Sequence, residues 1–146
     1  MNISINDIKI QDLLPQKPPF VMVDRLVSSD DIYSVAELEI KADNVFVEDN
    51  HMMAAGLVEN IAQTCAAGIG FRNLQANGKI KLGVIGAVNT LDIKRLPCVG
   101  ETITTKVKFV EEVFQMTLFE ATIRCGEEEM ATATIKTALT DIDANT

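Results

Sequence analysis

The fold of this chain depends on one apolar stretch, residues 54–68, which reads Ala54-Ala55-Gly56-Leu57-Val58-Glu59-Asn60-Ile61-Ala62-Gln63-Thr64-Cys65-Ala66-Ala67-Gly68. Its apolar side chains wrap most of the circumference of a helix, and a helix of that kind is buried on several sides. We expect it to run from about Met52 to Leu74, with Asn77-Gly78 as its stop signal. Glu59 stands in its middle, where a carboxylate is costly to bury without a partner. Glu59 therefore either faces a site or belongs to a specific hydrogen-bond network.

The segments before this helix predict a short helix and two strands. Residues 8–14 form a candidate short helix, capped by Asn6 or Asp7 and stopped by Pro15. Residues 20–27 begin with apolar and β-branched residues, which predicts a strand. Residues 28–31 predict a turn, and residues 32–40, with several apolar positions, predict a second strand. Together they predict a hairpin. Residues 43–51 are polar and are expected to be irregular.

The segments after the helix predict strands only, at residues 80–93, 101–113, 114–125 and 130–140, with 141–146 as a loose tail. One long helix with one antiparallel sheet predicts a single α+β domain, residues 1–146, in which the sheet curls around the helix. One helix cannot cover both edges of that sheet. Pairing of an edge strand with a second copy, and hence a homodimer, is the expectation.

Charge and cysteine content exclude several classes of function. The 146 residues carry a net charge of −8, which argues against a nucleic-acid partner because phosphate binding needs clustered Lys and Arg. No stretch predicts a signal peptide or a membrane span, and a cytoplasmic protein is expected. The spacing of Cys65, Cys98 and Cys125 fits neither a zinc motif nor a disulfide framework. We expect free thiols, no metal and no cofactor.

Three segments carry a resemblance to a known family. They are Leu13-Leu14-Pro15-Gln16-Lys17-Pro18-Pro19-Phe20-Val21-Met22-Val23-Asp24-Arg25, Glu59-Asn60-Ile61-Ala62-Gln63 and Arg95-Leu96-Pro97-Cys98-Val99-Gly100-Glu101. In this order they resemble segments of the hotdog-fold 3-hydroxyacyl-acyl-carrier-protein dehydratases; the second is similar to the family's helix motif Glu-Ala-x-Ala-Gln. The chain looks closest to a divergent, dehydratase-like branch associated with polyene and pigment biosynthesis.

The resemblance implies a hotdog dimer with its sites at the dimer interface. In such dehydratases a glutamate from the central helix works with a histidine from the other subunit on a 3-hydroxyacyl thioester. A backbone N–H at the helix start polarises the thioester carbonyl, as enolate chemistry requires. The resemblance implies that Glu59 is catalytic, that Gln63 supports it, and that Met53, Ala55 and Gly56 line the substrate site. It also implies an acyl carrier protein or coenzyme A thioester as the partner molecule.

The histidine does not carry over. In the family it stands fourteen residues before the glutamate, and that position in this chain is Val45. The chain's one histidine is His51, eight positions before Glu59. His51 is a candidate displaced catalytic residue, with an exposed loop histidine as the alternative. Asp49 is a candidate supporting or catalytic acid, with an ordinary turn residue as the alternative.

The sequence predicts dehydration of 3-hydroxyacyl thioesters by a homodimer and leaves two alternatives open. Because the family histidine is missing, the chain could instead be a non-catalytic acyl-binding subunit that pairs with a paralogous dehydratase. A third reading keeps the fold and uses Asp49 or Glu59 to activate water, as a thioesterase would. Gln63 could equally be an ordinary polar position.

Overall fold

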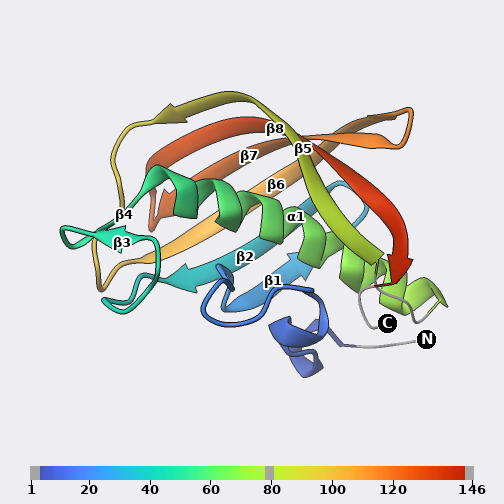
Figure 1. Cartoon of the computed structure of the whole chain (residues 1–146), viewed down its shortest axis with the longest axis horizontal. Helices are drawn as coiled ribbons and strands as arrows, with labels where there is room; N and C mark the ends of the chain where they lie inside the picture. Colours follow the sequence, from blue (N-terminus) through green and yellow to red (C-terminus); the bar gives the residue numbers. More distant parts are fainter. Residues whose placement is uncertain (1–3, 78–80, 144–146) are drawn as a thin grey trace.

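The structure, a computed structural model, describes residues 4–77 and 81–143 of the chain. Its centre is helix α1, Ala54–Asn77, which lies along one face of a six-stranded antiparallel sheet (Figure 1). The predicted helix at 52–74 is therefore confirmed, with both ends shifted by two or three residues. The predicted α+β arrangement of one long helix against one sheet is also confirmed.

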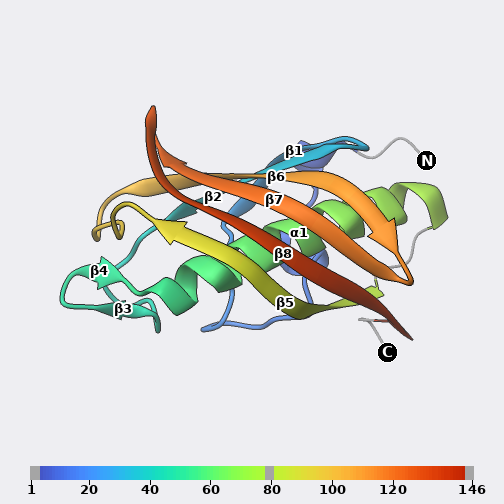
Figure 2. The ribbon, with the colours of Figure 1, turned by 90° about the horizontal axis from the view of Figure 1, so that it is seen from above.

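The sheet runs in the order β1-β2-β6-β7-β8-β5 and curves over the helix (Figure 2). Its strands are β1 (Arg25–Ser29), β2 (Tyr33–Glu39), β5 (Lys81–Ile93), β6 (Thr102–Val113), β7 (Met116–Cys125) and β8 (Glu128–Asp143). β8 pairs with β5 along most of its length. Residues 141–143 belong to it, so the expected loose tail is wrong there; residues 144–146 lie outside the described residues.

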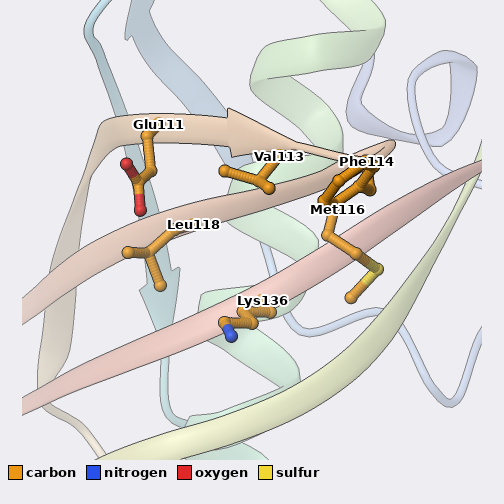
Figure 3. A pocket seen from close by; sticks show the side chains of 6 residues that line it. All are labelled: Glu111, Val113, Phe114, Met116, Leu118 and Lys136. Atoms are coloured by element: carbon orange, nitrogen blue, oxygen red, sulfur yellow. The ribbon is translucent and has the colours of Figure 1, made fainter.

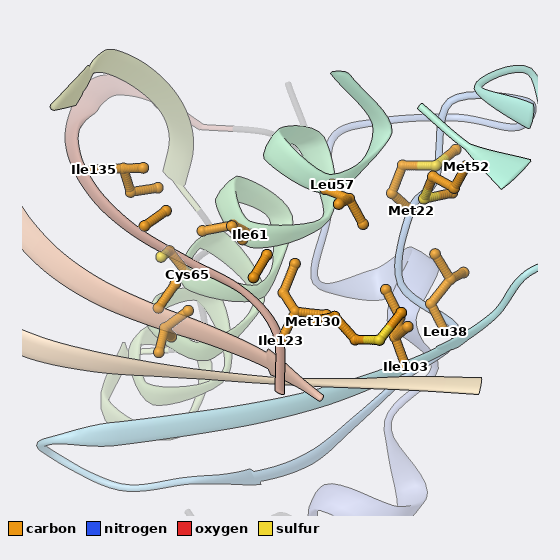
Figure 4. Packing of buried hydrophobic residues seen from close by; sticks show 14 of the residues in the cluster. Met22, Leu38, Met52, Leu57, Ile61, Cys65, Ile103, Ile123, Met130 and Ile135 are labelled. Carbon is orange, nitrogen blue, oxygen red and sulfur yellow. The ribbon is translucent and has the colours of Figure 1, made fainter. Parts of the chain in front are cut away.

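The core forms where the inner face of the sheet meets the helix. Alternate residues of each central strand are buried, as the two-residue period of a strand requires; in β7 these are Thr117, Phe119, Ala121 and Ile123. Figure 4 shows helix residues packing against strand residues in this cluster. Its members include Met22, Leu38, Met52, Leu57, Ile61, Cys65, Ile103, Ile123, Met130 and Ile135.

Two expectations before the helix are wrong. The segment expected to be a short helix at 8–14 contains only a 3₁₀ turn, Ile10–Asp12, preceded by another at Ile5–Asp7. The first strand begins at Arg25 and not at Phe20, because helix side chains, rather than a neighbouring strand, satisfy the backbone of residues 20–22.

The segment expected to be irregular before the helix contains a small hairpin. β3 (Val47–Glu48) pairs with β4 (His51–Met52). Asp49 and Asn50 connect the two strands with φ values of 52° and 66°. Positive φ at both central residues defines the tightest hairpin turn, and Asp and Asn tolerate that conformation. The hairpin thereby places His51 next to the start of α1.

Candidate active site

Glu59 lies one turn before Gln63 on α1, and the two side chains are in contact. Gln63 Nε2 donates a hydrogen bond to Glu59 Oε2 at 3.1 Å. Glu59 is half-buried, whereas Gln63 is buried. Residues four apart lie on the same face of a helix, so this contact follows from the spacing. The Glu59 carboxylate therefore has a hydrogen-bond partner on the helix and remains partly exposed to solvent.

Gln63 also binds the backbone of the segment that leads into β1. Its Oε1 accepts from the Met22 N–H at 2.7 Å, and its Nε2 donates to the Phe20 carbonyl at 2.9 Å. An N–H can only donate and a carbonyl can only accept, so these partners determine which way the amide points. Its nitrogen must face Phe20 and Glu59.

His51 is held by its own hairpin. Its Nδ1 lies 2.8 Å from the Asp49 carbonyl oxygen, and its backbone pairs with Glu48 and bridges to Cys98. Because a carbonyl only accepts, Nδ1 donates, and a neutral ring then carries its lone pair on Nε2. No hydrogen bond joins His51 to Glu59 within the single chain over residues 4–77 and 81–143.

Asp49 contributes to this arrangement through its backbone. The residue is exposed at the hairpin tip, and its carbonyl is the group that binds His51. Its carboxylate makes no hydrogen bond or ion pair with the helix within the described part of the chain. A supporting role for Asp49 therefore rests on how it orients the His51 ring.

The first turn of α1 places Met53, Ala55 and Gly56 together. Met53 and Ala55 are exposed, whereas Gly56 is buried, and its N–H donates to the Met53 carbonyl at 2.9 Å. A Cβ on Gly56 would come within 2.7 Å of Phe46 Cβ, so only glycine lets this loop pack so closely. The N–H groups of Ala54 and Ala55 come earlier in the first turn, where the helix itself offers no carbonyl to bind them. Met53 has no side-chain oxygen to cap them.

Other reactive groups lie elsewhere. All three cysteines are free, and burial raises the pKa of the Cys65 thiol, which makes it a poor nucleophile. No cluster of metal-binding side chains occurs among the residues that the structure describes.

A hollow of about 390 Å³ lies at the tip of the β6–β7 hairpin (Figure 3). Its lining residues Met116 and Leu118 alternate with core-facing Thr117 and Phe119, so it opens on the outer face of the sheet.

Comparison with known proteins settles the family. A family model described as ApeP-like, ApeP dehydratase, matches residues 8–146. The chain belongs to the ApeP-like dehydratase family. As an ApeP-like protein it also resembles the 3-hydroxyacyl-[acyl-carrier-protein] dehydratase FabZ of Clostridioides difficile (strain 630), at 27% identity over 94% of this chain and 99% of that relative. The predicted membership of a divergent dehydratase branch is confirmed.

Solved structures show the same fold. A chain of the dehydratase heterocomplex ApeI:P from Xenorhabdus doucetiae superposes with a TM-score of 0.85, at 15% identity and 92% coverage of each chain. A hypothetical thioesterase with coenzyme A from Streptococcus pneumoniae TIGR4 is more distant, with a TM-score of 0.62, 13% identity and coverage of 80% and 84%. These matches confirm the hotdog fold. The described part of the ApeP-like chain contains no helix that could span a membrane.

Sequence reasoning missed Asn60 and the residues that it binds. Asn60 is fully buried, its Nδ2 donates to the Met22 carbonyl at 2.8 Å, and its Oδ1 accepts from Thr105 Oγ1. One signal for it was visible in the sequence. A buried helix carries an amide at a position where the family motif has Ala, and a buried amide requires partners.

Proposed function

We propose that this chain is a dehydratase for 3-hydroxyacyl thioesters carried by acyl carrier protein, in fatty-acid or polyene-type biosynthesis. The observation that carries the proposal is the contact between Gln63 and Glu59, in the framework of a dehydratase family. The contact presents a half-buried carboxylate that is held on one side and open on the other. A general acid or base needs both a defined position and access to the substrate.

The reaction breaks the C2–H and C3–O bonds of the substrate, forms the C2=C3 double bond and releases water. It requires one group to take the C2 proton and one to protonate the departing hydroxyl. Glu59 is one of these two groups, and an imidazole is the other. The exposed first turn of α1 at Ala55 supplies a backbone N–H for the thioester carbonyl, whose oxygen gains negative charge as C2 loses its proton. Gly56 and Met53 shape the space around that group.

The imidazole comes from a partner subunit in this proposal. Two sources are available, namely His51 of a second copy and the family-position histidine of a paralogous subunit. The Nδ1 contact with Asp49 supports the first, because it leaves Nε2 as the acceptor. Val45 at the family position supports the second, as does the similarity to a chain of a dehydratase heterocomplex.

The test is an assay of the purified chain, alone and together with a hotdog dehydratase subunit that carries the family-position histidine. The substrates are 3-hydroxyacyl groups of several lengths on carrier protein and on coenzyme A, and mass spectrometry detects the enoyl product. We expect turnover, and Glu59→Gln should lower it by about 10²–10⁴-fold. Absence of turnover in both preparations, across all the chain lengths, contradicts the proposal.

Two further variants identify the source of the imidazole. If His51 of a second copy serves, the chain alone is active and His51→Ala removes that activity. If a paralogous subunit serves, the mixture is active and His51→Ala changes little. Val45→His then becomes a test of gained function, because Val45 is 45% exposed and precedes Phe46, which packs on Gly56 at the start of α1. We expect it to give the chain measurable activity without a partner.

The two alternative functions are not favoured, because the family model and the curated relatives are dehydratases. A thioesterase would release free thiol from acyl-coenzyme A, which a thiol reagent detects in the same assay.

We also propose a cytoplasmic location, since Cys65, Cys98 and Cys125 are all free thiols, as is usual in a reducing compartment.

A further inference from the structure

Residues 20–22 cross the helix next to the site without belonging to a strand. Three of their backbone groups are bound by two amide side chains of α1. Gln63 binds the Phe20 carbonyl and the Met22 N–H, and Asn60 binds the Met22 carbonyl. The contacts join residues 38 to 43 positions apart in the chain. We call the segment with its two amides the amide clamp.

Asn60 is the buried half of the amide clamp. The side chain is 0% exposed, and both of its polar atoms are bonded. Because the Met22 carbonyl only accepts, Nδ2 faces Met22, and Oδ1 then faces the Thr105 hydroxyl on β6, which donates. Thr105 is itself fully buried. The Met22 carbonyl therefore sets the direction of the Asn60 amide, and Thr105 anchors that amide to the sheet. Through Asn60, Met22 is tied to a buried position on β6.

Gln63 is the half of the clamp that touches the catalytic carboxylate. Its two contacts with residues 20–22 leave one Nε2–H, and that hydrogen points to Glu59 Oε2. If the segment moved away, the amide would lose two of its three partners, and the position of the nitrogen that donates to Glu59 would no longer be fixed. The donor that holds Glu59 therefore depends on the position of Met22.

We propose that Asn60, anchored by Thr105, is a positioning residue for Glu59. It acts through Met22 and Gln63 and does not touch the substrate. The inference rests on the proposed dehydratase function and deepens it, since it names what keeps the carboxylate in a productive geometry. The helix motif that this chain resembles has Ala at this position, so the device belongs to this chain's own sequence.

The test compares Asn60→Ala with wild type in the assembly that carries the dehydratase activity. A displacement of about 1 Å in a catalytic group can cost about 100-fold in rate. We expect kcat to fall by about 10- to 100-fold with KM changed by less than about 3-fold. Hydrogen–deuterium exchange should become faster at Met22, because its carbonyl loses the Asn60 donor and only the bond from its N–H to Gln63 Oε1 still holds it to the helix.

Two more variants keep the test decisive. Thr105→Val removes only the hydroxyl that anchors Asn60 and keeps the side-chain volume, so it should fold and lower kcat by a smaller factor. Thr64→Val is the matched control: it removes a buried hydrogen bond to the backbone carbonyl of Asn60 at 2.7 Å, without a contact to residues 20–22. We expect its kcat to match wild type.

The outcomes separate the inference from the function on which it rests. If wild type is inactive in every assembly, the dehydratase proposal fails. If wild type is active and Glu59→Gln is not, but folded Asn60→Ala and Thr105→Val both keep the wild-type kcat, the positioning role alone is overturned. An equal loss of kcat in Thr64→Val also overturns it, because that result would reflect general damage to α1.

Discussion

At Gly68, helix α1 approaches the side chains of β1 and β2 closely. A Cβ at this position would overlap Ser34 Oγ and come within 2.7 Å of Ser34 Cβ on β2. Ser34 Oγ is in turn bonded to Ser29 Oγ on β1 at 2.9 Å. A side chain at Gly68 would therefore displace Ser34 and disturb its hydrogen bond with Ser29. This contact helps to set the distance between the helix and the sheet.

Gly68→Ala should destabilise the protein although Ala is the better helix former. The gain in helix propensity is about 1 kcal/mol, and the overlap with Ser34 should cost about 1–3 kcal/mol more than that gain. Urea denaturation measures the net loss. The double variant with Ser34→Gly removes the obstructing side chain and should recover part of the stability. A Gly68→Ala variant as stable as wild type would show that the structure accommodates the added methyl group at little cost in free energy.

The two hairpins β3–β4 and β6–β7 have the same turn geometry but differ in how well their residues suit it. Asp49 and Asn50 tolerate positive φ. Phe114 and Gln115 occupy the same conformation in β6–β7, with φ values of 50° and 69°, and neither residue favours it. Phe114 is also 94% exposed, so little packing offsets the strain.

Replacement of Phe114-Gln115 by Asn-Gly should stabilise the protein by about 0.5–1 kcal/mol, because it relieves strain in the β6–β7 turn. The midpoint of urea unfolding reports the change. Asn50→Gly in the other hairpin is the matched control and should have a smaller effect, since Asn already accepts this conformation. A loss of stability in the Asn-Gly variant would mean that Phe114 makes stabilising contacts that outweigh the strain in the turn.

An ion cluster ties the end of β5 to β8 and to the turn before β6. Arg95 binds Glu101 at 2.7 Å and Glu128 at 2.8 Å. Hydrogen bonds from Arg95, and then from the Cys98 N–H, lower the pKa of Glu101 to about 2 from its usual 4.5. The folded state therefore holds this carboxylate ionised at a pH where the unfolded chain binds a proton.

Stability should fall as the pH drops from about 4.5 toward 2, because the pKa of Glu101 is lower in the folded state than in the unfolded one. Above pH 4.5 the contribution is complete. The side chain keeps 26% exposure, so screening limits the loss to about 1–2 kcal/mol.

Urea unfolding at pH 7, 4 and 3 checks this prediction. Glu101→Gln should lower the stability at pH 7 and flatten the decline. Glu127→Gln, at an exposed carboxylate in the β7–β8 turn, is the control and should leave the decline in place. An equally steep decline in Glu101→Gln would assign the acid sensitivity to other groups.

Assembly is expected to involve β5, the last strand of the sheet. β5 pairs with β8 on one side, while its other edge carries unpaired backbone groups within the described chain. Val88 and Leu91 on this strand are 39% and 38% exposed. A free edge with apolar side chains is a surface on which a second sheet can pair.

If two copies pair through β5, Val88→Lys should weaken their association by at least about 10-fold in Kd, because the lysine charge would lose its hydration at an edge that the dimer buries. Analytical ultracentrifugation over a range of concentrations measures this change. Val110→Lys is the matched control. Val110 is also 39% exposed, but it lies on β6, which has a neighbouring strand on each side and no free edge. Equal effects of the two variants, or none, would place the interface elsewhere.

Local patterns predicted most of the framework. The helix and five of the six sheet strands were predicted within a few residues, because their apolar periods and turn residues lie close together in sequence. The segment 8–14 failed because it is too short to form a helix without tertiary support. The strand predicted from residue 20 failed because the backbone of residues 20–22 pairs with side chains of α1, which no strand pattern reveals.

Glu59 and Gln63 were found from the sequence because a polar pair four residues apart on an apolar helix is a local pattern. Their geometry was not, because it depends on Phe20 and Met22, about 40 positions away. The residue types and their order are enough to predict the helix, most strands of the sheet and the position of Glu59 on the helix. The direction in which the Gln63 amide faces Glu59 follows from contacts that exist only when distant segments have packed, since each hydrogen bond needs both of its partners in place.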